Sequence, residues 1–453
     1  MSQAKIFGST DGVRGKANFP PLDTETVMHL GKALAEYLKK HVEINPNRPY
    51  RVIIGKDTRR SGYLIEQSLT AGFLSRGVDV VSVGPIPTPA ISHLVRSFAL
   101  DLGVMITASH NPYLDNGIKV FTARGTKLTI AEQDEVEKIY FEKDFPGTDT
   151  IGRAKRIEDV SGRYIEFLKS TVKSISLKGF TIVIDCANGA GYKAAPEVFK
   201  ELGAKVITIG VNPDGYNINK DCGALHPEKL AKTILKEKAD LGIALDGDGD
   251  RLIMVDETGK VIDGDYLMTL VAKYLKSKNR LRNDAIAVTQ YSNLAIVKEL
   301  RKYKIKVFND IENSDKAVLE KCKQENLIFG GEQSGHYIFL KYSIAGDGTL
   351  SALQVLRIMK DTGKKLSELA FTFEKYPQKL FNIKVNKKIP LEDLEAFQKI
   401  QEKWLKKFGK NGRIFSRYSG TENLLRIMVE AQDAKDMKNA GKELSEVAER
   451  ELR

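Results

Sequence analysis

Short apolar runs alternate with longer segments of helical periodicity along most of the chain, and this alternation starts afresh twice. The first round has a helical pattern at 63–77 and three apolar runs that predict strands, at 51–57, 78–84 and 102–107. The second round, 180–210, reads as strand, glycine-rich turn, helix and strand, and the third spans 284–339. Strands that are apolar throughout indicate sheets with both faces covered, so we expect α/β domains.

The sequence changes in character after about residue 368, where two helical patterns and three short apolar runs predict a small α+β domain. A chain of 453 residues is also too long for one hydrophobic core. We therefore predict three similar α/β domains with mixed sheets plus a smaller α+β C-terminal domain, arranged around a central cleft that the last domain closes. The predicted domains are residues 1–152, 153–252, 253–368 and 369–453.

Charge and composition narrow the choice of function. The net charge is +12, but the lysines are spread over helical stretches, so we interpret most of them as solvated helix faces and keep nucleic-acid binding as a remote alternative. No stretch is long and apolar enough to cross a bilayer, and the first residues lack the apolar core of a secretory signal. We therefore expect a cytoplasmic protein without a membrane partner. Neither a zinc site nor a disulfide framework is expected from the widely spaced cysteines, Cys186, Cys222 and Cys322.

An acidic loop lies between two predicted strands, and its aspartates alternate with glycines at Asp246, Asp248 and Asp250. Glycines let the backbone curl, so the three carboxylates can converge on one hard cation such as Mg²⁺. An EF-hand loop is one alternative, but its sixth position requires glycine where this chain has Arg251, and helices should flank it. A solvated acidic turn is another, but it would crowd three like charges together. We therefore predict a metal site.

A polar loop near the C-terminus is suited to phosphate. It contains Arg417, Ser419, Gly420 and Thr421, and Arg426 follows in the next apolar run. Hydroxyls, backbone N–H groups around a glycine and two arginines can together hold a dianionic phosphate. The alternative is a turn whose hydroxyls only satisfy local backbone donors. The two arginines favour phosphate.

Residues 331–336 form a third polar stretch, Gly-Glu-Gln-Ser-Gly-His. On an extended chain Glu332, Ser334 and His336 would face the same way, as a set aimed at sugar hydroxyls requires. Taken alone, a glutamate before a strand is usually just exposed, so this interpretation depends on its neighbours.

Ser109 and His110 follow the apolar run 102–107, and Pro112 prevents regular structure from continuing. We therefore expect the Ser109 hydroxyl at the carboxyl end of a strand, where open α/β sheets bind ligands. A Ser-His hydrolase is one interpretation, but the sequence has no G-x-S-x-G elbow, and neighbours on an extended chain point in opposite directions. Ser109 more plausibly carries a phosphoryl group beside the metal.

Four stretches together resemble the signatures of the α-D-phosphohexomutases, in the family's order: T-A-S-H-N-P (107–112), D-G-D-G-D-R (246–251), G-E-Q-S-G-H (331–336) and R-Y-S-G-T-E-N (417–423). The resemblance implies four domains around a cleft, with the fourth closing over the substrate's phosphate. It also implies a phosphoserine at Ser109 that exchanges its phosphoryl group with a phosphosugar through a bound bisphosphate. One Mg²⁺ would be held by Ser109 and the three aspartates.

The resemblance also assigns roles to single residues. Around the transferring group it places three cations: Arg14, Lys119 and Arg251. It makes Lys119 and His336 the general acid and base, with His110 in support, and a lysine beside cations can have its pKa lowered towards the working pH. The sugar hydroxyls would be held by Glu332 and Ser334. The phosphate that does not react would lie on Arg417, Ser419, Gly420, Thr421 and Arg426.

Within this family the chain most resembles the branch that interconverts glucosamine 6-phosphate and glucosamine 1-phosphate through glucosamine 1,6-bisphosphate. Seven stretches carry this resemblance: 9–16, 55–69, 84–90, 185–204, 212–228, 254–265 and 331–348. Two residues depart from the branch: Thr107 stands where serine is usual, and Asn423 where proline is usual. Threonine is more familiar in the phosphomannomutase/phosphoglucomutase branch, which stays an alternative, as does a non-catalytic phosphosugar-binding protein. The resemblance alone suggests a homodimer.

Overall fold

The computed structural model describes residues 5–8, 12–44, 48–142, 144–173, 175–419 and 423–452. The chain divides into two compact units, one of residues up to Gln290 together with Phe308–Ala370, and one of Tyr291–Val307 together with the residues from Phe371 onward. The first unit contains the elements of the α/β sheets, and a separate three-stranded sheet belongs to the second unit.

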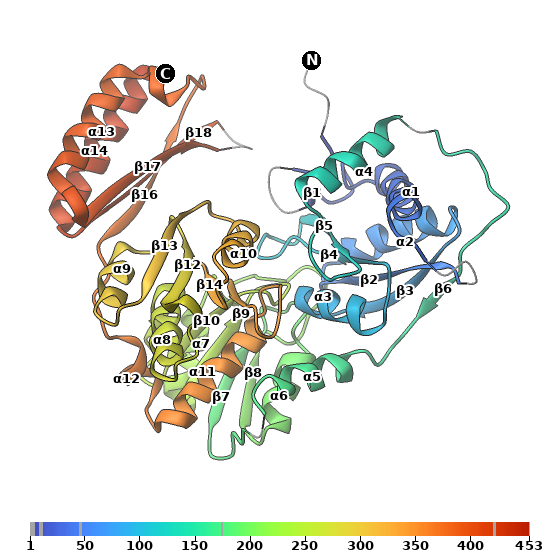
Figure 1. The fold of residues 1–453 in the computed structure, drawn as a ribbon, viewed down its shortest axis with the longest axis horizontal. Helices are drawn as coiled ribbons and strands as arrows, with labels where there is room; N and C mark the ends of the chain where they lie inside the picture. The colour runs from blue at the N-terminus through green and yellow to red at the C-terminus, as the bar shows by residue number, and fades with distance from the viewer. Residues whose placement is uncertain are drawn as a thin grey trace. The chain divides into compact units, whose positions relative to one another are not determined.

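The first sheet has six strands in the order β1-β5-β4-β2-β3-β6. Its strands are β1 (Val13–Lys16), β2 (Tyr50–Lys56), β3 (Val78–Pro85), β4 (Leu102–Ile106), β5 (Asp115–Thr122) and β6 (Ala154–Arg156). β2 pairs in parallel with β3 and β4, whereas β5 pairs antiparallel with β4 and β1. Its helices are α1 (Thr24–His41), α2 (Ser61–Leu74), α3 (Thr88–Ser97) and α4 (Ile130–Glu142). Figure 1 shows α3 on the opposite side of this sheet from α1 and α2.

The second sheet has five strands in the order β11-β10-β9-β7-β8. Its strands are β7 (Thr181–Asp185), β8 (Lys205–Ile209), β9 (Leu241–Leu245), β10 (Leu252–Asp256) and β11 (Val261–Ile262). Its helices are α5 (Ser161–Ser170), α6 (Ala194–Glu201) and α7 (Glu228–Glu237). The prediction of strand, turn, helix and strand over 180–210 is confirmed by β7, α6 and β8.

The pairing of β10 and β11 at the edge of this sheet concerns the predicted domain limit between residues 252 and 253. β10 pairs antiparallel with β9 over all five of its residues, and β11 pairs with β10. A limit between residues 252 and 253 would therefore separate β10 from its own sheet. We propose that the limit lies behind β11, and the other limits stay predictions.

The third sheet has four strands in the order β13-β12-β14-β15. Its strands are β12 (Ala285–Thr289), β13 (Lys306–Ile311), β14 (Phe329–Gly331) and β15 (Tyr337–Phe339). The elements around it are α8 (Gly264–Ser277), a 3₁₀ turn at Arg282–Asp284, α10 (Asp315–Gln324), α11 (Gly348–Thr362) and α12 (Leu366–Ala370). β14 and β15 form an antiparallel hairpin whose connection is 332–336, so the polar stretch predicted from the sequence is a turn between two strands.

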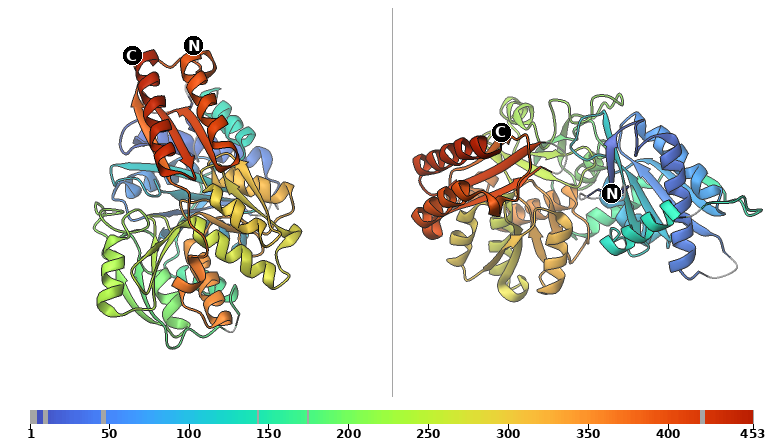
Figure 2. Two further views of the ribbon diagram at one scale, coloured as in Figure 1. Left: turned by 90° about the vertical axis from the view of Figure 1, so that its left-hand side faces the viewer. Right: turned by 90° about the horizontal axis from the view of Figure 1, so that it is seen from above.

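The second unit has an antiparallel sheet in the order β16-β18-β17. Its strands are β16 (Gln378–Lys384), β17 (Gly412–Tyr418) and β18 (Leu424–Ala431). Its helices are α9 (Leu294–Arg301), α13 (Glu395–Phe408) and α14 (Ala434–Leu452), with 3₁₀ turns at Leu391–Asp393 and Gly409–Asn411. Figure 2 shows α13 and α14 side by side on one face of the sheet, where Phe397, Trp404 and Leu444 are buried.

Three mixed α/β sheets followed by a smaller α+β unit confirm the predicted fold class. Each α/β sheet combines parallel inner pairs with an antiparallel edge, which explains why the three rounds of the sequence look alike. Closure of a cleft by the last domain stays a prediction. Among the residues that the structure describes, no helix is both long and apolar enough to span a bilayer.

Candidate active site

The aspartate loop connects β9 to β10, two neighbouring strands that are buried along their whole length. One ligand oxygen from each of Asp246, Asp248 and Asp250 lies within 4.8 Å of the others, and all three side chains are buried. Gly249 has φ +75°, a backbone conformation that favours glycine and that lets the loop curl between the two strands. The predicted convergence of the three carboxylates is therefore present.

Two of these carboxylates have neighbours from the first sheet. The Lys119 ammonium on β5 contacts Asp248 Oδ2 at 2.8 Å and Asp250 Oδ2 at 3.1 Å. The Thr88 hydroxyl at the start of α3 donates to Asp248 Oδ2 at 2.5 Å. The other oxygens, Asp248 Oδ1 and Asp250 Oδ1, are buried and have no hydrogen-bond partner among the described residues. Buried carboxylate oxygens without donors fit a bound cation, and an all-oxygen set suits a hard divalent ion.

Burial and charge act differently on the aspartates. Burial, together with the charges of Asp250 and Asp248, raises the pKa of Asp246 well above its usual range. Burial would also raise the pKa of Asp248, but the charge and hydrogen bond of Lys119 outweigh it and hold that pKa below the usual range. A cation bound at the loop would favour the ionised form of Asp246, in the way that Lys119 favours the ionised form of Asp248.

Ser109 lies in the turn that follows β4, and its hydroxyl donates to Asp246 Oδ2 at 2.6 Å. The turn is fixed by Thr107, whose hydroxyl accepts a hydrogen bond from the Ser109 N–H at 2.9 Å and donates to Asp57 Oδ2 at 2.6 Å. Ser109 has φ +51° and is buried. Serine and aspartates that are far apart in the sequence thus meet in the first unit.

The Ser109 carbonyl is held from two sides. Arg59, fully buried ahead of α2, donates from Nη2 at 3.2 Å. Asn219, from the loop that follows β8, donates from Nδ2 at 2.9 Å, and it also reaches Asn111 O at 3.2 Å. A Cβ added to Gly247 would lie 2.6 Å from the same carbonyl, so the aspartate loop packs directly on the serine turn.

The expectation that Ser109 and His110 point in opposite directions on an extended chain is wrong. Because Ser109 has a positive φ, the chain turns at this point, and Ser109 Oγ lies 3.4 Å from His110 Nδ1. Burial, with the charge of Arg251, lowers the pKa of His110 to about 4, so the ring is neutral near pH 7. The shorter contact of the serine hydroxyl is the one with Asp246, which favours chemistry at the aspartate loop.

The extended conformation expected for 331–336 is also wrong. Gly335 has φ +94°, the Gly335 N–H donates to Glu332 O at 3.1 Å, and the Glu332 N–H donates to His336 O at 2.9 Å. Glu332 and Ser334 nevertheless lie together, because the Ser334 hydroxyl donates to Glu332 Oε2 at 2.9 Å. A tight turn, and not strand alternation, brings these two side chains together.

His336 joins the aspartate loop to the third sheet. Its Nδ1 lies 3.8 Å from Asp250 Oδ1, its Nε2 lies 3.5 Å from Asp315 Oδ2, and its backbone bridges Arg251. Asp315 begins α10 and accepts from Lys127 Nζ at 2.5 Å. Burial would raise the pKa of Asp315, but the charges of Lys127 and His336 outweigh burial, so this pKa lies below its usual range. His336 is thus placed between two carboxylates.

Arg14 and Arg251, the two arginines predicted to lie around the transferring group, also reach this region. Arg14 on β1 donates from Nη1 to Thr107 O at 3.0 Å, and the Arg251 N–H donates to Asp246 Oδ1 at 3.2 Å. Burial would lower the pKa of Arg251, but Asp246 and the neighbouring acids raise it, so its charge is held firmly. Lys119 pairs with Asp248 and Asp250, and the charge of Arg14 also acts on Asp248, so the lowered pKa expected for a lysine beside cations stays a prediction.

The predicted phosphate loop belongs to the second unit. Arg417 on β17 pairs directly with Arg426 on β18, so both side chains leave the same face of the sheet. The Ser419 N–H donates to Leu424 O at 2.8 Å, and Lys388 Nζ donates to Ser419 O at 2.8 Å. Gly420 and Thr421 lie outside the described residues. Two like charges placed opposite each other suit a doubly charged anion.

Comparison with known proteins places this arrangement in a family. Models of its four domains match in order: phosphoglucomutase/phosphomannomutase α/β/α domain I at residues 4–147, domain II at 162–259, domain III at 263–376 and the C-terminal domain at 380–447. The chain belongs to the phosphoglucomutase/phosphomannomutase family. The resemblance to phosphohexomutases found in the sequence is thereby confirmed.

Relatives in the phosphoglucomutase/phosphomannomutase family include several named phosphoglucosamine mutase. That of Chlamydia trachomatis serovar D is 46% identical, covering 99% of this chain and 97% of the relative. That of Myxococcus xanthus is 47% identical, covering 100% and 98%.

Solved structures share the family's fold. A phosphoglucomutase/phosphomannomutase family protein from Burkholderia thailandensis has a TM-score of 0.80 at 23% identity, covering 98% of this chain and 97% of its own. The N-acetylphosphoglucosamine mutase of Aspergillus fumigatus, solved in complex with GlcNAc-6P and magnesium, has a TM-score of 0.66 at 19% identity, covering 100% and 96%.

Several contacts at this site were not assigned from the sequence. The stretches that resemble the glucosamine branch contain Thr88, Arg59 and Asn219, so the sequence marked the segments in which they lie. It did not indicate that these residues contact the aspartates or the serine. Asp315 and Lys127 lie outside those stretches; the packing of α10 brings Asp315 to His336, and Lys127 contacts Asp315.

Proposed function

We propose that this chain is a phosphoglucosamine mutase, an isomerase that interconverts glucosamine 6-phosphate and glucosamine 1-phosphate through a phosphoserine at Ser109. The observation that carries the proposal is the 2.6 Å contact between Ser109 Oγ and Asp246 Oδ2, within a buried loop of three aspartates. The names of the bacterial relatives support glucosamine phosphate as the phosphosugar.

The carboxylates of Asp246, Asp248 and Asp250, with the Ser109 phosphate, would hold one Mg²⁺, which neutralises charge as a phosphoryl group is transferred. Asp248 Oδ1 and Asp250 Oδ1, which are buried without a hydrogen-bond partner among the described residues, support this assignment. Thr88 orients Asp248 through its hydroxyl, and Lys119 donates to the same Asp248 oxygen and balances part of the charge.

In the first half-reaction, the free hydroxyl of the sugar phosphate attacks the phosphorus on Ser109. The new P–O bond forms as the P–Oγ bond breaks, which yields glucosamine 1,6-bisphosphate. His336 is the candidate base for the proton of the attacking hydroxyl, and Lys119 is the candidate acid that protonates Oγ. Arg14 and Arg251 would stabilise the transferring group, with His110 in support.

In the second half-reaction, the bisphosphate turns over in the site and returns its other phosphate to Ser109. Glu332 and Ser334 would hold the sugar hydroxyls in both orientations. The phosphate that does not react would lie on Arg417, Ser419, Gly420, Thr421 and Arg426, so one set of donors serves both halves of the cycle.

Replacement of the serine tests this proposal. Ser109→Ala should abolish mutase turnover and leave no acid-stable phosphate on the protein, whereas Ser277→Ala, at an exposed serine near the end of α8, should retain both. Turnover is followed with phosphorylated enzyme, and bound phosphate by intact mass. A fully active Ser109→Ala variant would end the phosphoserine proposal.

A phosphomannomutase/phosphoglucomutase is the second candidate, and Thr107 is the observation that favours it. Values of kcat/KM for glucosamine, glucose and mannose phosphates separate the two, since the preferred sugar should have the highest value. A non-catalytic phosphosugar-binding protein predicts no turnover of any of the three.

Two further properties stay predictions. We expect a homodimer, which light scattering would report as twice the chain mass of 50.5 kDa. We also expect a cytoplasmic location, which cell fractionation would test.

A further inference from the structure

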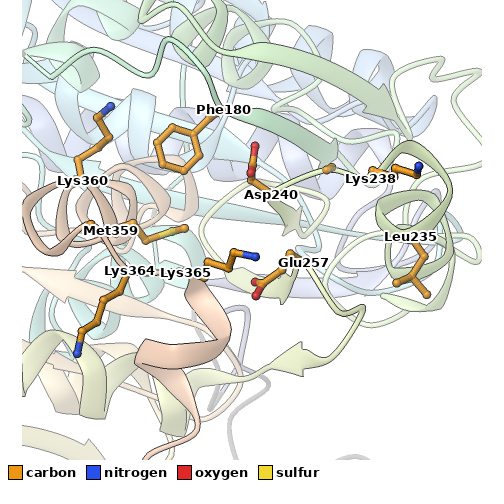
Figure 3. Close-up of a pocket in the computed structure, with 11 residues that line it drawn as sticks. Phe180, Leu235, Lys238, Asp240, Glu257, Met359, Lys360, Lys364 and Lys365 are labelled. Atoms are coloured by element: carbon orange, nitrogen blue, oxygen red, sulfur yellow. The ribbon is translucent and has the colours of Figure 1, made fainter.

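Two cavities in the first unit share no residue with the candidate active site. Figure 3 shows the smaller one, of about 530 Å³, where Lys238 and Lys365 lie with the carboxylates of Asp240 and Glu257. Its lining carries both signs of charge and therefore selects no kind of ion. The larger cavity differs in this respect.

The larger cavity has a volume of about 920 Å³ and lies among the end of α5, α8, α10, α11 and the β14–β15 hairpin. Its walls include the apolar side chains of Val271, Leu275, Leu327, Phe339 and Ile358. This volume lies within the range of pockets that enclose small molecules, and such pockets are mostly apolar with a few placed polar groups.

Cations line this cavity and acids do not. Among the described residues, its lining includes six basic side chains and no carboxylate: Lys173, Arg280, Arg282, Lys323, Lys341 and Arg357. The nearby Asp361 accepts from the Tyr274 hydroxyl and lies 3.8 Å from Arg357 Nε, but it is not part of the lining. Arg282 donates one hydrogen bond, from Nη1 to Asn326 Oδ1 at 2.8 Å, and keeps further donors on the same guanidinium. The cavity therefore favours an anion.

Polar and aromatic groups complete the lining. Gln354 and Thr171 are buried and joined by a hydrogen bond from Nε2 to Oγ1 at 3.1 Å. Tyr274 and Tyr342 add two aromatic rings. Arg357 and the Tyr274 hydroxyl both contact Asp361, and Arg280 lines the same cavity. Arginine near an aromatic ring suits a ligand that has both a flat face and negative charge.

We propose that this cavity binds a nucleotide, with its base against the apolar wall and its phosphates at Arg280 and Arg282. A sugar phosphate has no large apolar face to cover this wall, and inorganic phosphate has none at all. The site is thus separate from the mutase site, and the proposal does not depend on the mutase activity.

The experiment uses the full chain and the fluorescent probe 8-anilinonaphthalene-1-sulfonate, an aromatic anion whose emission rises in apolar surroundings. The test variant is Arg280→Glu/Arg282→Glu, at two exposed residues. The control is Lys364→Glu/Lys365→Glu, which makes the same charge change at the cavity of Figure 3. We expect the probe's affinity to fall about tenfold or more in the test variant only. We also expect ATP to displace the probe about tenfold better than tripolyphosphate, because only ATP carries a base.

Three results would each overturn the proposal: absence of probe binding to the unaltered chain, equal affinity in the two charge variants, or equal displacement by ATP and tripolyphosphate. Should the double glutamate variant melt early, Arg280→Gln/Arg282→Gln removes the same charges without adding new ones, and its affinity decides in its place.

Discussion

Thr107→Val removes the hydroxyl that holds the serine turn while keeping the size of the side chain. The hydroxyl makes two buried hydrogen bonds, one from the Ser109 N–H and one to Asp57, which still has Arg59 as a partner when Thr107 is changed. The main loss is therefore a buried N–H without an acceptor, which costs about 1–3 kcal/mol. Because this cost bears on the position of the reacting serine, we expect kcat to fall about 10- to 100-fold.

Thr107→Ser is the matched control, because it keeps the hydroxyl and removes one methyl group, at a cost of about 1 kcal/mol. It also introduces the residue that is usual in the glucosamine branch. Steady-state kinetics with glucosamine 6-phosphate should show near-normal kcat for the serine variant and an unchanged KM for both variants, since Thr107 faces Asp57 and the serine turn. Equal kcat values for Thr107→Val and Thr107→Ser would refute the assignment of Thr107 as the residue that positions Ser109.

Three further predictions concern pH, the metal and the phosphate. Burial, with the charges of Arg96 and Arg163, lowers the pKa of His93 from 6.5 to about 4. The imidazole takes up a proton at a higher pH in the unfolded chain than in the folded one, so its contribution to stability is complete above about pH 6.5 and is lost as the pH falls towards 4. Because the ring is partly exposed and solvent screens part of the effect, urea unfolding at about pH 5 should show a loss about 1 kcal/mol larger than in His93→Phe. Chelation of divalent ions should stop turnover and added Mg²⁺ should restore it, whereas an undiminished rate would remove the metal role of the aspartates. Arg417→Gln should raise KM for glucosamine 6-phosphate about 10- to 100-fold, and a similar rise in Arg301→Gln, at an exposed residue of α9, would contradict a specific phosphate contact.

Much of the fold was predictable because its signals are local. Strands β2, β3 and β4 correspond to the apolar runs 51–57, 78–84 and 102–107, and each lies within one residue of these predicted limits. The aspartate loop was also predictable, since alternating glycines and aspartates between two strands leave few other conformations.

The site was less predictable where tertiary contacts decide the conformation. The prediction of an extended conformation for 331–336 was wrong because Gly335 adopts a positive φ and the His336 backbone bridges Arg251. The alternation of side chains in the sequence reveals neither feature. The sequence around Asp315 indicates only an acidic residue at the start of a helix. Its contact with His336 forms because α10 packs beside that residue. The contacts of Lys119 with Asp248 and Asp250 could not be predicted from the sequence, because these partners are more than a hundred residues away along the chain.

The Ser109 carbonyl accepts hydrogen bonds from Arg59 of the first α/β domain and from Asn219 of the second. Any opening motion that separated these two domains would break the second contact and release the reacting serine from its place beside Asp246. If Ser109 carries the phosphoryl group as we propose, the residue keeps its place beside Asp246 only while the first two domains stay joined.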